Sequence, residues 1–129
     1  MDTKEYLGTL RLFEARIDQK KEQLRVLKRR RSHFAAPDRS EKISRLKSEI
    51  SEQIVQLESL RGEIIDRIQS LDNYRFVRVL YMHYVEYKSF DQIAAEVGYA
   101  LSHTYRIHRD ALAALEKVSA DRQKRVNNG

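Results

Sequence analysis

The chain has 129 residues, of which 25 are Lys or Arg and 19 are Asp or Glu, so its formal net charge is +6. This length holds one ordinary domain or two small modules, and it excludes the large α/β enzyme architectures. The lack of cysteine excludes disulfides and a thiolate nucleophile, and it suits a reducing compartment. One proline and four glycines argue against an all-β chain, which needs many turns. The predicted class is therefore all-α. Because there is no apolar run of about 18 residues and no signal-peptide pattern, we expect a cytoplasmic protein with no membrane partner.

Two long helices are predicted for residues 3–71. The first apolar series alternates steps of four and three residues through Tyr6, Leu10, Phe13, Ile17, Lys20, Leu24, Leu27 and Arg31. The second runs through Ile43, Leu46, Ile50, Gln53, Leu57, Leu60, Ile64, Arg67 and Leu71. Such series are typical of a coiled-coil seam. Pro37 interrupts the helix, and Asp38 with Glu41 forms a candidate capping box for the second one. The matched lengths predict an antiparallel helical hairpin.

The apolar side of the second helix is wider than a single helical partner requires. The residues that we assign to oligomerisation on this side are Ile50, Ile54, Leu57, Ile64 and Ile68. We interpret residues 3–71 as an oligomerisation or spacing element, and we expect a homodimer in which two hairpins pair. Two alternatives stay open, because the helix can instead support the C-terminal part or complete a monomeric core.

The composition changes at Asn73, after which aromatic side chains are frequent. We expect a third helix whose core face carries Tyr74, Val77, Leu80, Tyr81 and Tyr84. Ser89 and Gln92 form a second capping box for a short helix that ends at Gly98. A final helix then turns inward a set of mainly apolar residues: Thr104, Ile107, Ala111, Leu112 and Leu115. The tail from Ser119 to Gly129 is expected to fray.

A short helix, a glycine turn and a longer helix with a polar leading end form the pattern of a helix-turn-helix motif, here over residues 73–118. The stretch SFDQIAAEVGYALSHTYRIHRDALAAL resembles the region-4 helix-turn-helix of bacterial sigma factors. More broadly, residues 3–116 resemble phage-encoded late transcription regulators of the ArpU/RinA type. The matching pieces are Tyr74-Arg75, Leu80, Tyr84, Ile93-Ala94, Val97-Gly98-Tyr99 and Tyr105-Arg106-Ile107-His108. The resemblance implies sequence-specific binding of double-stranded DNA that regulates late phage or prophage genes, at the host nucleoid and with host RNA polymerase as a further partner.

The residues that we assign to DNA contact are Ser89, Leu101, Ser102, His103, Tyr105, Arg106 and Arg109. The two arginines suit guanine edges or phosphates. The chain departs from the sigma-like pattern at Ala100, where a Ser or Thr normally caps the recognition helix, so Ser102 can shift the helix start. Leu101 and Tyr105 also stand where sigma-like modules are polar or basic, which predicts fewer charged contacts.

Other chemistry has little support in the sequence. There is no Ser/His/Asp constellation, glycine-rich phosphate loop or carboxylate pair, so we expect neither an enzyme nor a cofactor. His83, His103 and His108 lack the spacing of a metal site. The basic run 28–31 can contact DNA or polymerase, or it can simply be a solvated helix end, where basic residues suit the helix dipole. Two further functions stay open: a terminase small subunit, and an interaction protein that binds polymerase without touching DNA.

Overall fold

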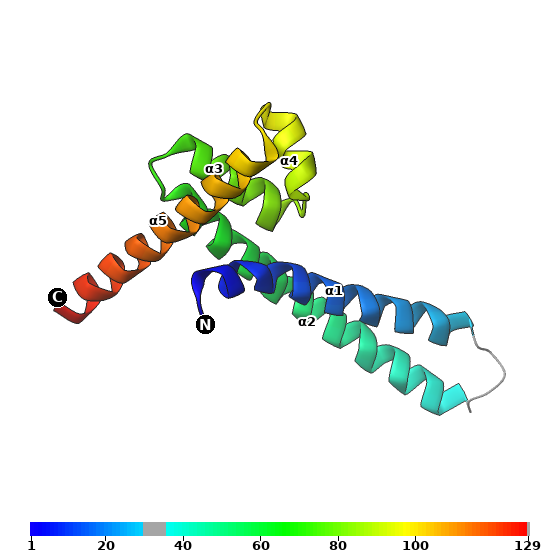
Figure 1. The fold of residues 1–129 in the computed structure, drawn as a ribbon. Coiled ribbons are helices and arrows are strands. Elements are labelled where there is room, and N and C mark those ends of the chain that lie inside the picture. Colours follow the sequence, from blue (N-terminus) through cyan, green and yellow to red (C-terminus); the bar gives the residue numbers. More distant parts are fainter. Residues whose placement is uncertain (30–35, 129) are drawn as a thin grey trace. The chain divides into compact units, whose positions relative to one another are not determined.

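The computed structural model describes residues 1–29 and 36–128, and every regular element within these ranges is helical. In chain order the elements are α1 (Thr3–Arg29), α2 (Ala36–Gln69), α3 (Tyr74–Leu80), the π-helical segment η1 (Tyr81–Val85), α4 (Phe90–Val97) and α5 (Leu101–Asn128) (Figure 1). The all-α prediction is confirmed. None of these helices is long and apolar enough to cross a membrane.

The chain divides into two compact units. The larger unit comprises Met1–Arg11 and Arg61–Gly129, and the smaller unit comprises Leu12–Leu60. Both α1 and α2 therefore contribute to each unit, whereas the sequence suggested a boundary near residue 72. We describe each unit by itself.

In the smaller unit, segments of α1 and α2 run antiparallel. Lys20 Nζ lies 3.6 Å from Glu49 Oε2. Closer to the connection, the Arg39 side chain donates hydrogen bonds to the carbonyl oxygens of Leu27 at 3.2 Å and Lys28 at 2.7 Å. The buried side chains are Ile17, Ile50 and Leu57, which all belong to the predicted seams. The period of the apolar residues therefore selects the packed sides of the two segments.

The start of α2 differs from the prediction. The helix begins at Ala36, so Pro37 and Asp38 lie in its first turn, and the capping box expected at Asp38 is wrong. Proline fits the first turn because its missing N–H has no partner there and its fixed φ suits a helix. Arg30 and Arg31, which end the predicted basic run and the first seam, lie outside the described residues.

In the larger unit, the first turns of α1 pack on the end of α2. Leu7, Leu10, Ile64 and Ile68 are fully buried. The Tyr6 hydroxyl donates a hydrogen bond of 2.6 Å to Glu63 Oε1. Burial, followed by the hydrogen bond to this carboxylate, raises the pKa of Tyr6 to about 12. The apolar rows of the two helices thus complete a core and do not stay on the surface.

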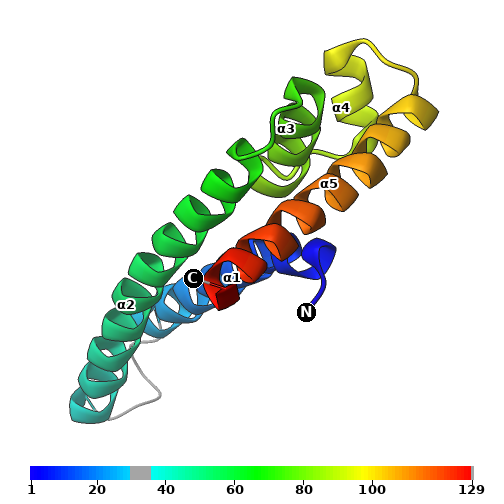
Figure 2. The same cartoon turned by 90° about the vertical axis from the view of Figure 1, so that its left-hand side faces the viewer.

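The helix α3 packs on α5, and η1 and α4 complete the same core (Figure 2). Its centre is a cluster of four apolar side chains, Val79, Met82, Ile93 and Ile107. The Asn73 side chain caps α3 by accepting hydrogen bonds from the backbone N–H groups of Arg75 at 2.9 Å and Phe76 at 3.4 Å.

The predicted core face of the third helix is wrong in part. Tyr74 is 73% exposed, whereas Val79 is 1% exposed. The face that packs on α5 is rotated by about one residue from the predicted face. The π-helical segment η1 adds one residue to a turn, as the hydrogen bond of 3.1 Å from the Glu86 N–H to the Tyr81 carbonyl shows. Tyr84 is buried, as predicted.

The end of the chain also differs from the prediction. The helix α5 continues to Asn128, so residues 119–128 are helical. This segment contains neither proline nor glycine, the two residues that most disfavour a helix interior. Its described side chains are exposed from Ala120 onward.

Candidate nucleic-acid interface

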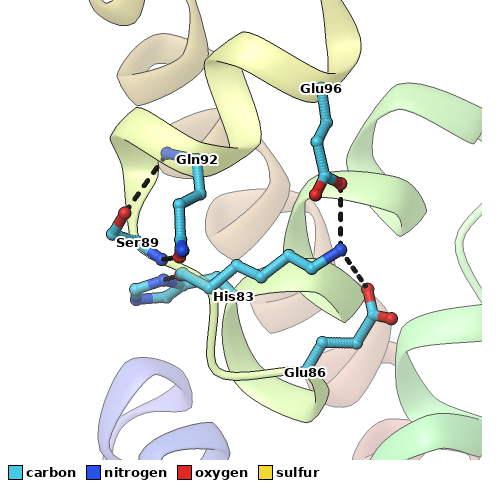
Figure 3. A network of polar contacts seen from close by, with 6 residues as sticks. His83, Glu86, Ser89, Gln92 and Glu96 are labelled. Carbon is cyan, nitrogen blue, oxygen red and sulfur yellow. Dashed lines mark hydrogen bonds and ion pairs between the residues drawn. The ribbon is translucent and has the colours of Figure 1, made fainter.

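The short helix α4 opens the candidate interface with a capping box. The hydroxyl of Ser89 accepts a hydrogen bond of 3.2 Å from the backbone N–H of Gln92, whose side-chain oxygen accepts one of 2.9 Å from the Ser89 N–H (Figure 3). This confirms the predicted start of the helix.

The helix ends where the sequence predicts, at Gly98. Its φ of 76° lies in the left-handed region. The N–H groups of Gly98 and Tyr99 donate to the Ala94 carbonyl at 2.9 and 3.1 Å. Glycine adopts this conformation without the steric cost of a Cβ, so the chain can turn within three residues into α5.

A network of ion pairs fixes the loop before α4. Lys88 Nζ lies 2.9 Å from a carboxylate oxygen of Glu96 and 3.7 Å from one of Glu86, and Nδ1 of His83 lies 2.8 Å from the Lys88 carbonyl (Figure 3). The hydrogen bond to Glu96 is the main reason why the pKa of Lys88 is raised. Because this loop leads directly into Ser89, the network holds the N-terminal end of α4 in place.

The first turn of α5 is built around Ala100 and Thr104. The Ala100 carbonyl accepts hydrogen bonds from the Thr104 N–H at 3.0 Å and from its hydroxyl at 3.1 Å. The helix therefore starts at Leu101, and Ser102 does not shift the start. Thr104 is fully buried, and its hydroxyl is hydrogen-bonded within the chain. The hydroxyl is therefore not available to a ligand.

The first turns of α5 separate into a buried side and an exposed side. Thr104, Ile107, His108 and Ala111 are buried. Besides Asp110, the exposed residues are Leu101, Ser102, Tyr105, Arg106 and Arg109, all five of them predicted DNA contacts. Their spacing of three and four residues places them along one stripe of the helix. The structure thus brings together five of the seven predicted contact residues on a single helix face.

The remaining two predicted contacts lie at the margins. Ser89 is exposed, but its oxygen already caps α4. His103 is half-buried, and its ring lies edge-on to Tyr99 with 5.0 Å between ring centroids.

The two arginines of the exposed side differ in their surroundings. Arg109 already has an anionic neighbour, because its Nε lies 3.5 Å from Asp110 Oδ1. Arg106 is therefore the better placed of the two arginines to meet an external anion.

Tyr105 is exposed yet held by an aromatic neighbour. Its ring centroid lies 4.8 Å from that of Phe90 on α4, and 49% of its surface is accessible. Phe90 also stacks on His83, with 4.2 Å between centroids. A tyrosine fixed on one side and open on the other offers a rigid apolar surface with a hydroxyl at its edge.

A buried polar pair lies beneath this aromatic contact. The Tyr84 hydroxyl lies 2.7 Å from Nε2 of His108. Burial, then the nearby His83 and Lys4, lowers the pKa of His108 to about 4, while burial raises that of Tyr84 to about 12. His108 is therefore neutral near pH 7, and its ring bonds to a residue 24 positions away in the chain.

The structure adds two residues that the predicted contact set lacks, Arg75 and Tyr99. The Arg75 guanidinium carbon lies 5.8 Å from the centroid of the Tyr99 ring, which in turn contacts His103. Arg75 is exposed. Both residues are among the pieces that carry the resemblance, but only the tertiary contact places Arg75 beside the turn before α5.

The predicted oligomerisation residues lie mainly inside the single chain. Ile50, Leu57, Ile64 and Ile68 are 7, 6, 0 and 0% exposed, whereas Ile54 is half-buried. A homodimer stays a prediction, but four of these five side chains already have their packing partners within one copy.

Two other features were considered at the sequence level. Lys28 and Arg29 are exposed at the end of α1, and the rest of that basic run is not described. Within the described ranges, no group of three or more His, Cys, Asp or Glu side chains is placed to hold a metal ion.

Comparisons of the chain with models of protein families, with curated proteins and with solved structures found no match.

Proposed function

We propose that the chain binds double-stranded DNA through α4 and α5, used as a helix-turn-helix, and regulates transcription in a phage or prophage. The observation that carries this proposal is the exposed stripe of Ser102, Tyr105, Arg106 and Arg109, which directly follows the left-handed turn at Gly98. A recognition helix must present hydrogen-bonding side chains at its leading end to reach base edges in the major groove.

The chemistry of the stripe suits the major groove. Arg106 can donate two hydrogen bonds to a guanine, and Ser102 can serve either a base or a phosphate. The apolar side chain of Leu101, 38% exposed, and the fixed ring of Tyr105 can contact thymine methyl groups. Arg75, beside the turn, is suited to a phosphate, which would position the helix without reading sequence.

The resemblance to region 4 of sigma factors and to ArpU/RinA-type regulators supports the same assignment. It rests on residues that now have defined structural roles, among them the packed Ile93-Ala94 pair and the turn at Gly98. A regulator of this kind acts at late genes and can contact host RNA polymerase.

One observation favours a second function. Leu101 and Tyr105 are apolar and exposed where a phosphate-binding helix is usually basic, so the same stripe can bind a protein surface. A module that binds only RNA polymerase is therefore the competing proposal. The terminase small subunit has no such observation in its favour.

The test begins with a selection of bound fragments from the genomic DNA of host and prophage, which supplies the specific duplex. Fluorescence anisotropy then compares this duplex with a scrambled one at several salt concentrations. We expect Arg106→Ala to weaken specific binding by about 1–3 kcal/mol and to relax preference at one base pair. Arg75→Ala and Arg109→Ala should weaken binding to both duplexes alike, each with a salt slope lower by about one.

The control is a variant with Lys28→Ala and Arg29→Ala, which removes two exposed cations outside the stripe. It should leave the sequence preference unchanged. If Arg106→Ala and Arg109→Ala both bind the two duplexes like the wild type, α5 is not a DNA-recognition helix. The polymerase-binding function then becomes the leading one.

A further inference from the structure

The helix α5 extends well beyond the core that it helps to build. Its last buried side chain is Leu115, and every described side chain from Ala120 onward is exposed. The helix nevertheless continues to Asn128 (Figure 2). Because the segment beyond Ala120 buries no apolar side chain, packing on the core does not explain its presence.

This extension of α5 is basic. Residues 117–128 contain four Lys or Arg residues and one acidic residue, Asp121, so they carry a net charge of +3, against +6 for the whole chain. Lys117 and Lys124 are exposed, and neither forms an ion pair with any described residue. Lys117 also lies about three turns before the end of the helix, too far for the helix dipole to account for a cation there. Both lysines are therefore available to an external anion.

The two lysines lie on the side of α5 that carries the exposed stripe. An α-helix turns by about 100° per residue, so Lys117 lies about 20° around the helix from Arg106, and Lys124 lies in line with Arg106. At about 1.5 Å per residue, they are about 16 and 27 Å further along the helix axis. Arg122 belongs to the same extension but lies about 160° around the helix from Arg106. It lines a hollow with Arg67 of α2, on the opposite side of α5.

This spacing suits the backbone of a DNA duplex. The distance from Arg106 to Lys117 exceeds the width of the major groove, which is about 12 Å. A helix whose leading end lies in the groove therefore passes the edge of the groove before it reaches Lys117. Phosphates line that edge, and the duplex carries about one negative charge per 1.7 Å of its axis. In homeodomains, the C-terminal end of the recognition helix contacts the backbone in this way.

We propose that the outer side of α5 beyond the core, marked by Lys117 and Lys124, is a second DNA-contact surface, which binds phosphates where the helix leaves the major groove. The proposal rests on the proposed function, because Arg106 defines which side of α5 faces the duplex. Arg75 lies beside the turn before α5, so the exposed stripe has a phosphate contact at each of its ends. Such contacts fix the position of a helix in the groove without reading the sequence.

The experiment measures binding of the full chain by fluorescence anisotropy, with the specific and the scrambled duplex, at several salt concentrations. Each duplex extends about 10 base pairs, one helical turn, on both sides of the recognised bases. Lys117→Gln should weaken binding to both duplexes about five-fold near 0.15 M salt and lower the salt slope by about one. Lys124→Gln should act in the same direction but more weakly, because it lies about 10 Å further along α5, more than one Debye length. The sequence preference should stay unchanged in both variants.

The matched control is Arg122→Gln, which removes one exposed cation from the same extension on the opposite side of the helix. It should bind both duplexes like the wild type. Circular dichroism should show unchanged helicity in all three variants, because glutamine forms helices about as well as lysine and arginine do. Hydroxyl-radical footprinting gives a second readout. The wild type and Arg122→Gln should protect a stretch of backbone beside the recognised bases that Lys117→Gln leaves open.

Two results overturn this proposal. One is an equal effect of Lys117→Gln and Arg122→Gln on affinity and salt slope, because the charge of the extension then acts without a preferred side. The other is wild-type binding and an unchanged footprint for Lys117→Gln while Arg106→Ala still loses specific binding. The extension is then better suited to an acidic protein surface, and the recognition stripe keeps its assignment. Failure of the proposed function is a different result, in which Arg106→Ala and Arg109→Ala bind both duplexes like the wild type.

Discussion

Acid should destabilise this protein through His108. The residue is 8% exposed, and its folded-state pKa of about 4 lies below the ordinary value of 6.5. The unfolded chain therefore binds a proton at a higher pH than the folded chain does. The stabilisation is complete above a pH of about 6.5, and it is lost as the pH falls toward 4.

The expected size follows from the two pKa values. At pH 5 a histidine in the unfolded chain is almost fully protonated, whereas His108 in the folded chain is still mainly neutral. The difference lowers the free energy of unfolding by about 2 kcal/mol relative to pH 7. The cause is the cost of placing a charge among buried groups, next to the Tyr84 hydroxyl and within 5.6 Å of the His83 ring.

Urea unfolding followed by circular dichroism, at one protein concentration and several pH values, measures this effect. Carboxylates also titrate over this range, so the informative quantity is the difference between the wild type and His108→Gln. The glutamine keeps a polar group near Tyr84 but cannot be charged, and it should remove about 2 kcal/mol of the pH dependence. His103→Gln serves as the control, and it should lose as much stability between pH 7 and 5 as the wild type does. If the wild type and His108→Gln lose equal stability between pH 7 and 5, the assignment of the effect to His108 is wrong.

Two further predictions concern the packing around the candidate interface, and thermal unfolding checks both. Gly98→Ala should cost about 1–2 kcal/mol from backbone strain alone, because φ is 76° and no atom lies within 4 Å of the added Cβ. Gly62→Ala, in open space on α2, should instead stabilise by about 0.5–1 kcal/mol, and equal shifts in the two variants would contradict the argument. Ile93→Ala should cost about 2–5 kcal/mol because the side chain is fully buried, whereas Leu101→Ala on the exposed stripe should cost well under 1 kcal/mol. A small loss for Ile93→Ala would show that α4 is not packed on this core.

Several features of the candidate site could be predicted from the sequence because each depends on residues that are close together in the chain. The capping box of Ser89 and Gln92 depends on residues three apart, and the turn at Gly98 depends on one residue type. The inward side of α5, from Thr104 to Leu115, follows from a regular helical period. Hydrogen bonds and steric limits within a few residues decide these features, so they need no knowledge of the rest of the chain.

Local patterns do not predict which segments pack against each other in the folded chain. A period of 3.6 residues held through the third helix predicts Tyr74 in the core, but contact with α5 sets the packed side and leaves Tyr74 73% exposed. Likewise, the apolar period of the second helix predicts that Ile64 and Ile68 are buried, but it does not predict which segments pack against them. The structure buries them within one copy.

The sequence by itself determined that the chain is helical, where α4 begins and ends, and which side of the last helix faces outward. These properties depend on backbone hydrogen bonding, on caps and on apolar periodicity, all of which act over one or two turns. Only the tertiary structure decided that Tyr84 meets His108 across 24 residues and that Arg75 lies beside Tyr99. Such contacts join segments far apart in the chain, and they form only where the packing of all the helices together leaves room for them.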